Sequence, residues 1–314
     1  MKICIIGANG HWQYALHQLA KNEVLGVAPG FDGEDVSGVV DTLAKNGIAT
    51  QVVESLEEFY GKADVAIVNT RFDLNAVVTA EFLKRDIFVF SEKPLATTIE
   101  QLEMLKDAQK NSKAFVCAMF GIRYEWWFKT VEGAVKDLGK IRMINAQKSY
   151  KLYTRPDFYK DIKTFGGLIP WVAIHAIDWA HALVKKDFDL VSAITDNQYN
   201  YNHGDLEMTA LCQFKTDDGC VVSVNADYFR PETADTHDDD RLRVVCTEGV
   251  VEYQCGKVML IDKKGTKVLE KSPEEDVFEL FLRRINGEET GVTSDESFYL
   301  TELALKARDM AKEA

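Results

Sequence analysis

The sequence predicts an α/β protein: an N-terminal Rossmann-like parallel-sheet domain, then an α+β domain with an open, mainly antiparallel sheet. Short strands that are apolar on both faces alternate with helices over the first 120 residues, which indicates a parallel sheet covered on both sides. The first strand runs into a glycine-containing turn and a helix, as in Rossmann-like units. Beyond about residue 141 the strand patterns are joined by short turns, which favours antiparallel hairpins.

Each element of the first domain, predicted over residues 1–120, has a local signal. Apolar runs predict the strands, helical spacing predicts the helices, and Thr98 and Ser55 are candidate N-caps, the latter in a capping box with Glu58. The expected strands are Lys2–Ile6, Val24–Ala28, Ala49–Val53, Asp64–Asn69, Ile87–Phe90 and Ala114–Ala118. The expected helices begin near Trp12 and cover Asp41–Lys45, Leu56–Tyr60, Asn75–Lys84 and Glu100–Asn111.

The second domain is predicted over residues 121–314. Its strands alternate or run apolar between turns such as Thr216–Gly219. The expected strands are Arg142–Lys148, Val191–Thr195, Met208–Phe214, Cys220–Ala226, Leu242–Cys246 and Val258–Ile261. The expected helices are Trp127–Lys136, Pro170–Lys185, Glu275–Asn286 and Glu296–Lys312.

Composition excludes several classes of protein. The 314 residues include 37 Lys plus Arg against 50 Asp plus Glu, a formal charge of −13, which argues against nucleic-acid or polybasic membrane partners. We expect no membrane-spanning helix and no secretory signal, and hence a cytoplasmic protein. The six cysteines form no CxxC pair, so buried reduced thiols are favoured over a zinc site, and no metal site is expected.

The turn after the first strand reads Gly7-Ala8-Asn9-Gly10-His11-Trp12. A dinucleotide fingerprint places glycines at 7, 9 and 12, and only Gly7 matches. The strand–turn–helix context still suits a pyrophosphate at the helix N-terminus. The second strand ends without the acid that binds ribose hydroxyls, and we interpret the Asp32, Glu34 and Asp35 that follow as a solvated loop.

Two later segments carry candidate chemistry. Glu92-Lys93-Pro94 follows a buried strand, so Glu92 and Lys93 are expected in the crevice where open α/β sheets bind ligands; the alternative is a surface ion pair. Gly166-Gly167 precedes a helix on which His175 and Asp178 are three residues apart and therefore neighbours. A histidine beside a carboxylate can act as acid or base, although a buried histidine satisfied by a local hydrogen bond gives the same pattern.

Together these segments resemble the glucose–fructose oxidoreductase / inositol dehydrogenase (Gfo/Idh/MocA) family. The resemblance rests on Glu92-Lys93-Pro94, the strand Asp64–Thr70, Arg123-Tyr124, Gly166-Gly167 with His175 and Asp178, and Arg241–Gly249. It implies NAD or NADP as cofactor, a sugar, sugar acid or polyol as substrate, and a second domain that often mediates assembly into a homodimer or homotetramer.

The resemblance also implies roles for residues. Lys93 would contact the substrate hydroxyl and the nicotinamide ribose, His175 would accept the proton of the alcohol, and Asp178 completes the catalytic set. The cofactor-binding residues it implies are Gly7, Asn9, Gly10, His11, Trp12, Thr70, Arg71, Asn75, Glu92 and Lys93. The substrate-binding residues expected are Arg123, Tyr153, Arg155, Tyr159 and Trp171, of which Arg155 could clamp a carboxylate or be an exposed loop residue.

Some positions depart from the family pattern. Trp171 stands where enzymatic members usually carry an Asp, and Arg71 and Asn75 replace a Pro and a His. Two alternatives therefore stay open beside a dehydrogenase: a non-catalytic dinucleotide- or sugar-binding regulator, and an enzyme that uses NAD as a redox relay for net non-redox glycoside chemistry. The run Asp235–Asp240 is interpreted as a solvated acidic loop, with His237 a residue that could approach the site.

Overall fold

The computed structural model describes residues 1–313, which divide into two compact units. Unit 1 comprises Met1–Gly121, Lys163–Gly166 and Asp276–Glu302. Unit 2 comprises Ile122–Ile162, Gly167–Glu275 and the chain from Leu303 onward. Two later segments of the chain therefore belong to the N-terminal unit.

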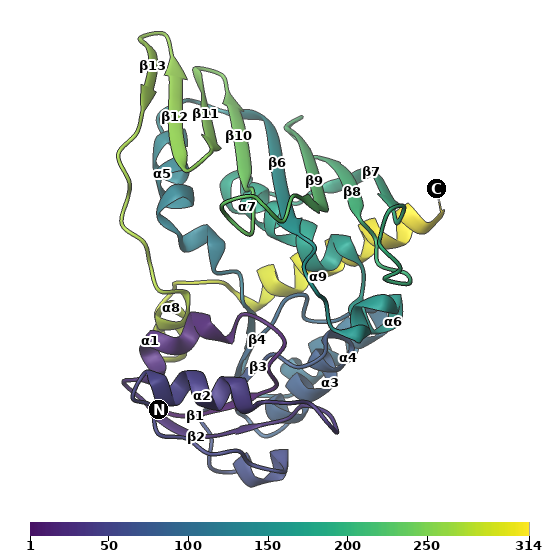
Figure 1. Cartoon of the computed structure of the whole chain (residues 1–314). Helices are drawn as coiled ribbons and strands as arrows, with labels where there is room; N and C mark the ends of the chain where they lie inside the picture. Colours follow the sequence, from purple (N-terminus) through teal and green to yellow (C-terminus); the bar gives the residue numbers. More distant parts are fainter. Residues whose placement is uncertain (314) are drawn as a thin grey trace. The chain divides into compact units, whose positions relative to one another are not determined.

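Unit 1 is built on a parallel sheet with strand order β2-β1-β3-β4-β5 (Figure 1). The strands are β1 (Lys2–Ile6), β2 (Glu23–Ala28), β3 (Val65–Val68), β4 (Phe88–Ser91) and β5 (Val116–Ala118). Ile6 lies beside both Ala28 and Val68, and Val68 lies beside Ser91, so the carboxyl ends of neighbouring strands meet at one edge. The predicted Rossmann-like sheet is confirmed.

Helices in unit 1 follow the predicted order with shifted bounds. They are α1 (Leu16–Leu19), α2 (Ser37–Lys45), α3 (Phe72–Leu83), α4 (Ile99–Lys110), α8 (Val277–Ile285) and the first part of α9 (Ser294–Glu313). Thr98 caps α4 by accepting a hydrogen bond from the Gln101 N–H at 3.2 Å, as predicted. The segment after the first turn starts as a 3-10 helix, Trp12–Ala15, and a single α-helical turn, α1, follows it.

Three local predictions in unit 1 are wrong. Residues 49–53 form no strand, since only Val52 bridges to Val27. Leu56–Phe59 is a 3-10 helix, and the Ser55 hydroxyl pairs with the carboxylate of Glu57 instead of Glu58. A 3-10 turn brings residue i+2 closer to the cap than an α-helical turn does, and this changes the partner.

Unit 2 contains an open, mixed sheet with strand order β13-β12-β11-β10-β6-β9-β8-β7. Its neighbours are antiparallel except for β6 and β9, which run parallel. The strands are β6 (Ile141–Lys151), β7 (Asp189–Asp196), β8 (Thr209–Lys215), β9 (Val221–Arg230), β10 (Arg241–Cys246), β11 (Gly249–Gln254), β12 (Lys257–Asp262) and β13 (Gly265–Val268). β11 and β13 were not predicted, because neither has a long apolar run.

One face of this sheet is buried against helices α5 (Trp126–Val135) and α7 (Ile174–Val184) (Figure 1). Alternate residues of β9, from Val222 to Tyr228, point to that face and are buried. The residues between them are exposed or half-buried on the other face. The period of two therefore separates a covered face from an open one.

The helical stretch Ile162–Val184 includes the short α6 (Ile162–Phe165) and a π-helical turn, Ile169–Ala173. By length and composition it could cross a membrane, with a mean hydropathy of 1.3 over its most apolar window. However, 78% of that window is buried in the fold, as in the core helix of a soluble protein. Among the six cysteines, Cys255 is exposed, which corrects the expectation that all are buried.

Gly7 and Gly38 provide a matched test of backbone geometry. Gly7 has φ +83°, and a Cβ there would lie 2.5 Å from the Thr70 Cα, whereas Gly38 lies in α2 with open space around it. We predict that Gly7→Ala lowers the free energy of unfolding by about 2–4 kcal/mol. Gly38→Ala should raise it by up to about 1 kcal/mol. Urea unfolding followed by circular dichroism measures both, and equal effects would contradict the prediction.

Candidate active site

The carboxyl ends of β1, β3 and β4 bring several predicted residues of unit 1 together. A Cβ on Gly10 would lie 2.2 Å from the Glu92 Oε2, so the turn after β1 approaches the end of β4 as closely as a glycine allows. Thr70, at the end of β3, leaves similarly little room beside Gly7 and Gly30. These glycines are explained by contact between strand ends.

Glu34 is buried, so the expectation of a solvated loop at this residue is wrong. Its carboxylate accepts hydrogen bonds from the N–H groups of Ala8 (3.2 Å) and Gly30 (2.6 Å). It also accepts from the Asn9 amide and from the Thr70 hydroxyl. A carboxylate from the loop after β2 therefore occupies the turn that follows β1.

Glu92 is a second buried carboxylate at the same turn. It accepts the His11 N–H at 2.5 Å and lies 2.9 Å from the His11 Nδ1. Burial alone would raise the pKa of Glu92, but interactions with His11 and Lys93 outweigh it and bring the pKa below its usual value. Glu92 is therefore an anion at neutral pH, beside the fully buried Lys93, whose own N–H donates to Glu92 at 3.1 Å.

Other predicted cofactor residues of unit 1 have different surroundings. The Arg71 guanidinium forms a two-point ion pair with Asp73, with Nε 2.6 Å from Oδ1 and Nη2 3.0 Å from Oδ2, which raises the pKa of Arg71. Trp12 is buried in the core. Asn75, on α3, is fully buried, and neither atom of its amide has a hydrogen-bond partner among the described residues.

In unit 2, the turn before the catalytic candidate His175 depends on glycine. Gly167 has φ +109°, and the next N–H, of Leu168, donates to the Glu207 carboxylate at 2.6 Å. Burial raises the pKa of Glu207, which the Leu168 N–H opposes. Helix α7 then carries His175, which is 1% exposed.

Asp178, one turn after His175 on α7, forms a buried ion pair with Arg123. The Arg123 Nη1 lies 3.3 Å from the Asp178 Oδ1, and both side chains are almost fully buried. The sequence suggested that Asp178 orients His175 and that Arg123 binds substrate. The structure pairs the Asp178 carboxylate with the Arg123 guanidinium, and the roles suggested for the two residues stay predictions.

The remaining substrate candidates form an aromatic and cationic group. The Tyr159 and Trp171 rings are 6.3 Å apart, and the Arg155 guanidinium lies 5.7 Å from the Tyr159 ring centroid and 4.9 Å from that of Tyr228. Arg155 donates one bond to the Lys151 carbonyl, and its Nε has no partner within residues 1–313. Tyr153 is exposed and stacked on the His237 ring, with the ring centroids 5.2 Å apart.

A buried ionic cluster next to this group was not predicted. The Lys148 Nζ lies 3.0 Å from the Asp238 Oδ2 and 2.7 Å from the Asp240 carboxylate, above the Trp179 ring. Burial raises the pKa of Asp240 to about 7, against the lowering effect of Lys148, whereas the pKa of Asp238 stays below its usual value. The expectation of a solvated acidic loop is therefore wrong for Asp240, whose side chain is 10% exposed, whereas 45% of the Asp238 side chain remains exposed.

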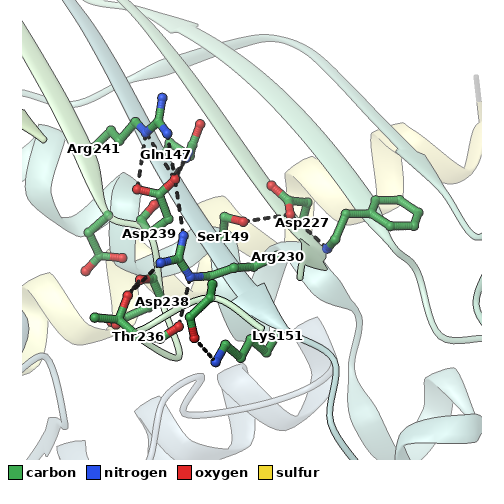
Figure 2. Close-up of polar contacts among 12 residues, drawn as sticks. Gln147, Ser149, Lys151, Asp227, Arg230, Thr236, Asp238, Asp239 and Arg241 are labelled. Carbon is green, nitrogen blue, oxygen red and sulfur yellow. Dashed lines mark hydrogen bonds and ion pairs between the residues drawn. The ribbon is translucent and has the colours of Figure 1, made fainter. Parts of the chain in front are cut away.

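Figure 2 shows how the same loop is attached to the open face of the sheet. Arg230 donates to the Thr236 carbonyl at 2.9 Å, and Arg241 donates to Asp239 at 2.7 Å. Lys151 donates to the Ala234 carbonyl. No group of three or more His, Cys, Asp or Glu side chains in the described chain could hold a metal ion.

Sequence reasoning missed Glu34, Lys148, Asp240, Glu207 and Tyr228. Lys148 had a detectable signal, because it falls in phase with the inward-facing Ile144 and Ala146 of β6. Glu34 had none: its carboxylate reaches the turn only because of the path of the loop. Proximity across the sheet edge is a property of the fold, not of local sequence.

Two family profiles match this arrangement. The oxidoreductase family with an NAD-binding Rossmann fold (Gfo/Idh/MocA) matches residues 1–120, and its C-terminal domain matches residues 133–252. A solved Thermotoga maritima protein classed as an oxidoreductase is 43% identical with a TM-score of 0.96, and the alignment covers 99% of this chain and 98% of that one.

More distant proteins share the fold. The aldose–aldose oxidoreductase of Caulobacter crescentus, solved with glycerol, is 16% identical with a TM-score of 0.84, covering 100% of this chain and 98% of that one. Inositol 2-dehydrogenase of Salmonella typhimurium is 27% identical over 138 residues, which are 43% of this chain and 39% of the relative. This match thus spans well under half of the curated relative.

The fold and the matched profiles define a two-unit member of an oxidoreductase family, with an NAD-binding Rossmann domain. The chain belongs to the Gfo/Idh/MocA family.

A nicotinamide dinucleotide fits part of unit 1. The Asn75 amide and the Asn69 Oδ1 are buried and have no partner in the described chain, and such groups are normally satisfied by a ligand or water. Both residues follow or adjoin β3, on the strand-end side where open α/β sheets bind ligands. The turn after β1 is less suited to binding a pyrophosphate, because its Ala8 and His11 N–H groups already donate to Glu34 and Glu92.

The ionic cluster of unit 2 is open to a stability test. We predict that Lys148→Met lowers the free energy of unfolding by about 3–5 kcal/mol, because it leaves the largely buried carboxylate of Asp240 without its cation. The matched control is Lys186→Met, which removes a lysine from an exposed pair with Asp217 and should change little. Urea unfolding of both variants measures the free energy of unfolding. An unchanged value for Lys148→Met would contradict the prediction.

Proposed function

We propose that the chain is an NAD(P)-dependent dehydrogenase or reductase that moves hydride between nicotinamide and a hydroxyl of a sugar, sugar acid or polyol. The observation that carries the proposal is the fully buried Lys93 beside the ionised Glu92 at the carboxyl end of β4. Burying a cation costs free energy because the charge loses its hydration. Buried ionisable groups of this kind concentrate at functional sites.

The chain's own residues supply charge and proton transfer. The Lys93 ammonium stabilises negative charge as it develops on the substrate oxygen. His175, held on α7 near the Asp178–Arg123 ion pair, accepts the hydroxyl proton through its ring. A bound nicotinamide would supply the acceptor for the hydride from the carbon that carries the substrate hydroxyl.

The proposed cofactor residues are those that line the strand ends of unit 1. The Asn75 amide and Thr70 offer polar contacts, and the turn from Gly7 to Trp12 provides close backbone approach. Glu34 adds an acceptor for ribose hydroxyls, which favours NAD over the 2′-phosphate of NADP. Tyr159, Trp171 and Arg155 are proposed substrate contacts in unit 2.

A second candidate is a dinucleotide- or sugar-binding regulator of the same fold. Two observations favour it: carboxylates occupy the turn N–H groups, and Trp171 stands where an acid was expected. A redox relay with net non-redox glycoside chemistry would use the same residues. We further propose a cytoplasmic protein and a homo-oligomer, assembled through unit 2.

The catalytic assignment predicts a loss of turnover that is separate from any loss of folding or dinucleotide binding. Lys93→Met and His175→Asn should each lower kcat at least about 100-fold, because each removes charge or proton transfer in the transition state. Thermal unfolding and dinucleotide binding by calorimetry show whether either variant still folds and binds cofactor. Nicotinamide absorbance with a panel of sugars, sugar acids and inositols measures turnover. No turnover by the wild-type chain, with dinucleotide still bound, would support the regulator instead.

Glu34 predicts the choice of dinucleotide. The wild-type chain should bind NAD at least tenfold more tightly than NADP, and Glu34→Gln should narrow that ratio because it removes the charge that repels a 2′-phosphate. Asp32→Asn, an exposed change in the same loop, is the matched control. Calorimetric titration with both dinucleotides measures the ratio, and equal wild-type affinities would refute the assignment.

A further inference from the structure

A hollow of about 550 Å³ lies in unit 2, beyond the ends of β6 and β9. Its wall is unusually aromatic, with Tyr228 at the buried side and Tyr153, Tyr201 and Phe229 around it. Tyr201 is 70% exposed, Tyr153 51% and Phe229 43%. Large rings left in contact with water around a concavity mark a place where a ligand or partner binds.

The backbone around the hollow is held in unfavourable conformations. Tyr153 has φ 49° and Tyr201 has φ 53°, both in the left-handed region that bulky residues avoid. Hydrogen bonds hold both segments: the Tyr153 N–H donates to the Glu232 Oε1 at 2.9 Å, and the His203 N–H donates to the Asn200 carbonyl at 3.1 Å. Strain of this kind persists where it positions a side chain for function.

Polar groups on the same wall are fixed and point to a hydroxyl-rich ligand. The His203 Nδ1–H donates to the Asn200 carbonyl at 2.7 Å, which leaves its Nε2 as an acceptor. Glu232 uses one carboxylate oxygen for Tyr153. Arg230 is clamped to Thr236 and Asp239 (Figure 2), so the start of the loop is rigid.

The hollow adjoins the proposed substrate group. Tyr228 lines the hollow and lies under the Arg155 guanidinium, 4.9 Å from its ring centroid. Arg155 also covers Tyr159, whose ring contacts Trp171 at the start of the helical segment that carries His175. A chain of packed side chains within unit 2 thus joins the hollow to the proposed catalytic helix.

We propose that this hollow is a subsite for a second glycosyl unit, so that the substrate is a glycoside, such as a disaccharide, and not a free monosaccharide or cyclitol. A pyranose ring presents apolar C–H faces and polar O–H edges, which match exposed aromatic faces beside hydrogen-bond acceptors. The inference rests on the proposed function for the class of substrate, and it adds the size of that substrate.

The test compares one-ring and two-ring sugars on the full chain. Isothermal titration with glucose, myo-inositol, cellobiose, maltose and phenyl glucosides should give at least tenfold tighter binding of one or more two-ring compounds. Tyr201→Ala and Phe229→Ala should each reduce that advantage about tenfold, the loss expected for one stacked ring, and leave one-ring binding unchanged.

Tyr199→Ala is the matched control. Tyr199 is in the same loop, has φ 58° and is 78% exposed, but lies outside the wall that the structure gives the hollow. This variant should bind every sugar as the wild type does. Circular dichroism of the three variants shows that each folds.

Several results would overturn the subsite. These are equal binding of one-ring and two-ring sugars, no binding of any two-ring compound, or the same behaviour of Tyr201→Ala and Tyr199→Ala. A Tyr201→Ala chain that changes oligomeric state in size-exclusion chromatography without changing sugar binding would assign the hollow to contacts between copies. Lys93-dependent turnover with no two-ring preference leaves the proposed function standing and removes the subsite. Binding of two-ring sugars without turnover would support the subsite and count against the proposed function.

Discussion

The contact between the Glu92 carboxylate and the turn after β1 determines the arrangement of the proposed cofactor region. A buried carboxylate needs hydrogen-bond donors, and His11 supplies them from its backbone and its ring. The same anion lies next to Lys93 and lowers the cost of burying that ammonium. Turn, strand end and catalytic candidate are therefore coupled, because a change in the position of Glu92 affects all three.

In unit 2 a buried charge again fixes neighbouring segments, but the central charge is positive. There a buried cation, Lys148, lies between two aspartates of the β9–β10 loop and fixes that loop against the sheet. The Arg123–Asp178 pair does likewise for α7. Because a buried ion pair is strongly destabilised when one partner is lost, these pairs enforce geometry more than they add stability. Such fixed walls would suit the hydroxylated substrate that we propose.

The sheet architecture was predictable because most strands carry their own signal. The continuous apolar run of β3 and the alternation in β9 reflect burial on two faces or one. The exposed strand β13 could not be predicted, because it has no buried face to leave an apolar pattern. It forms a strand because its backbone pairs with β12. Ser55 was recognised as a cap, but its carboxylate partner was misplaced by one residue because the turn is 3-10.

Candidate residues could be selected from the sequence where they fall on a motif, but not where a residue reaches the turn only because a loop folds back onto it. Lys93 was selected because it follows a buried strand, and His175 and Asp178 because helical spacing makes them neighbours, whereas their proposed roles come from the resemblance to the family. Glu34 was interpreted as solvent-exposed, because nothing in its neighbours shows that the loop returns to the first turn.

Gly10, in the turn after β1, falls outside the glycine positions of the dinucleotide fingerprint and limits which substitutions this turn can accept. Since any side chain at residue 10 would overlap the Glu92 carboxylate, the two positions are sterically interlocked. A side chain at residue 10 fits only if the Glu92 carboxylate moves away from the turn, which breaks the hydrogen bond that it accepts from the His11 N–H. The effect of a substitution at either position is therefore expected to depend on the residue at the other.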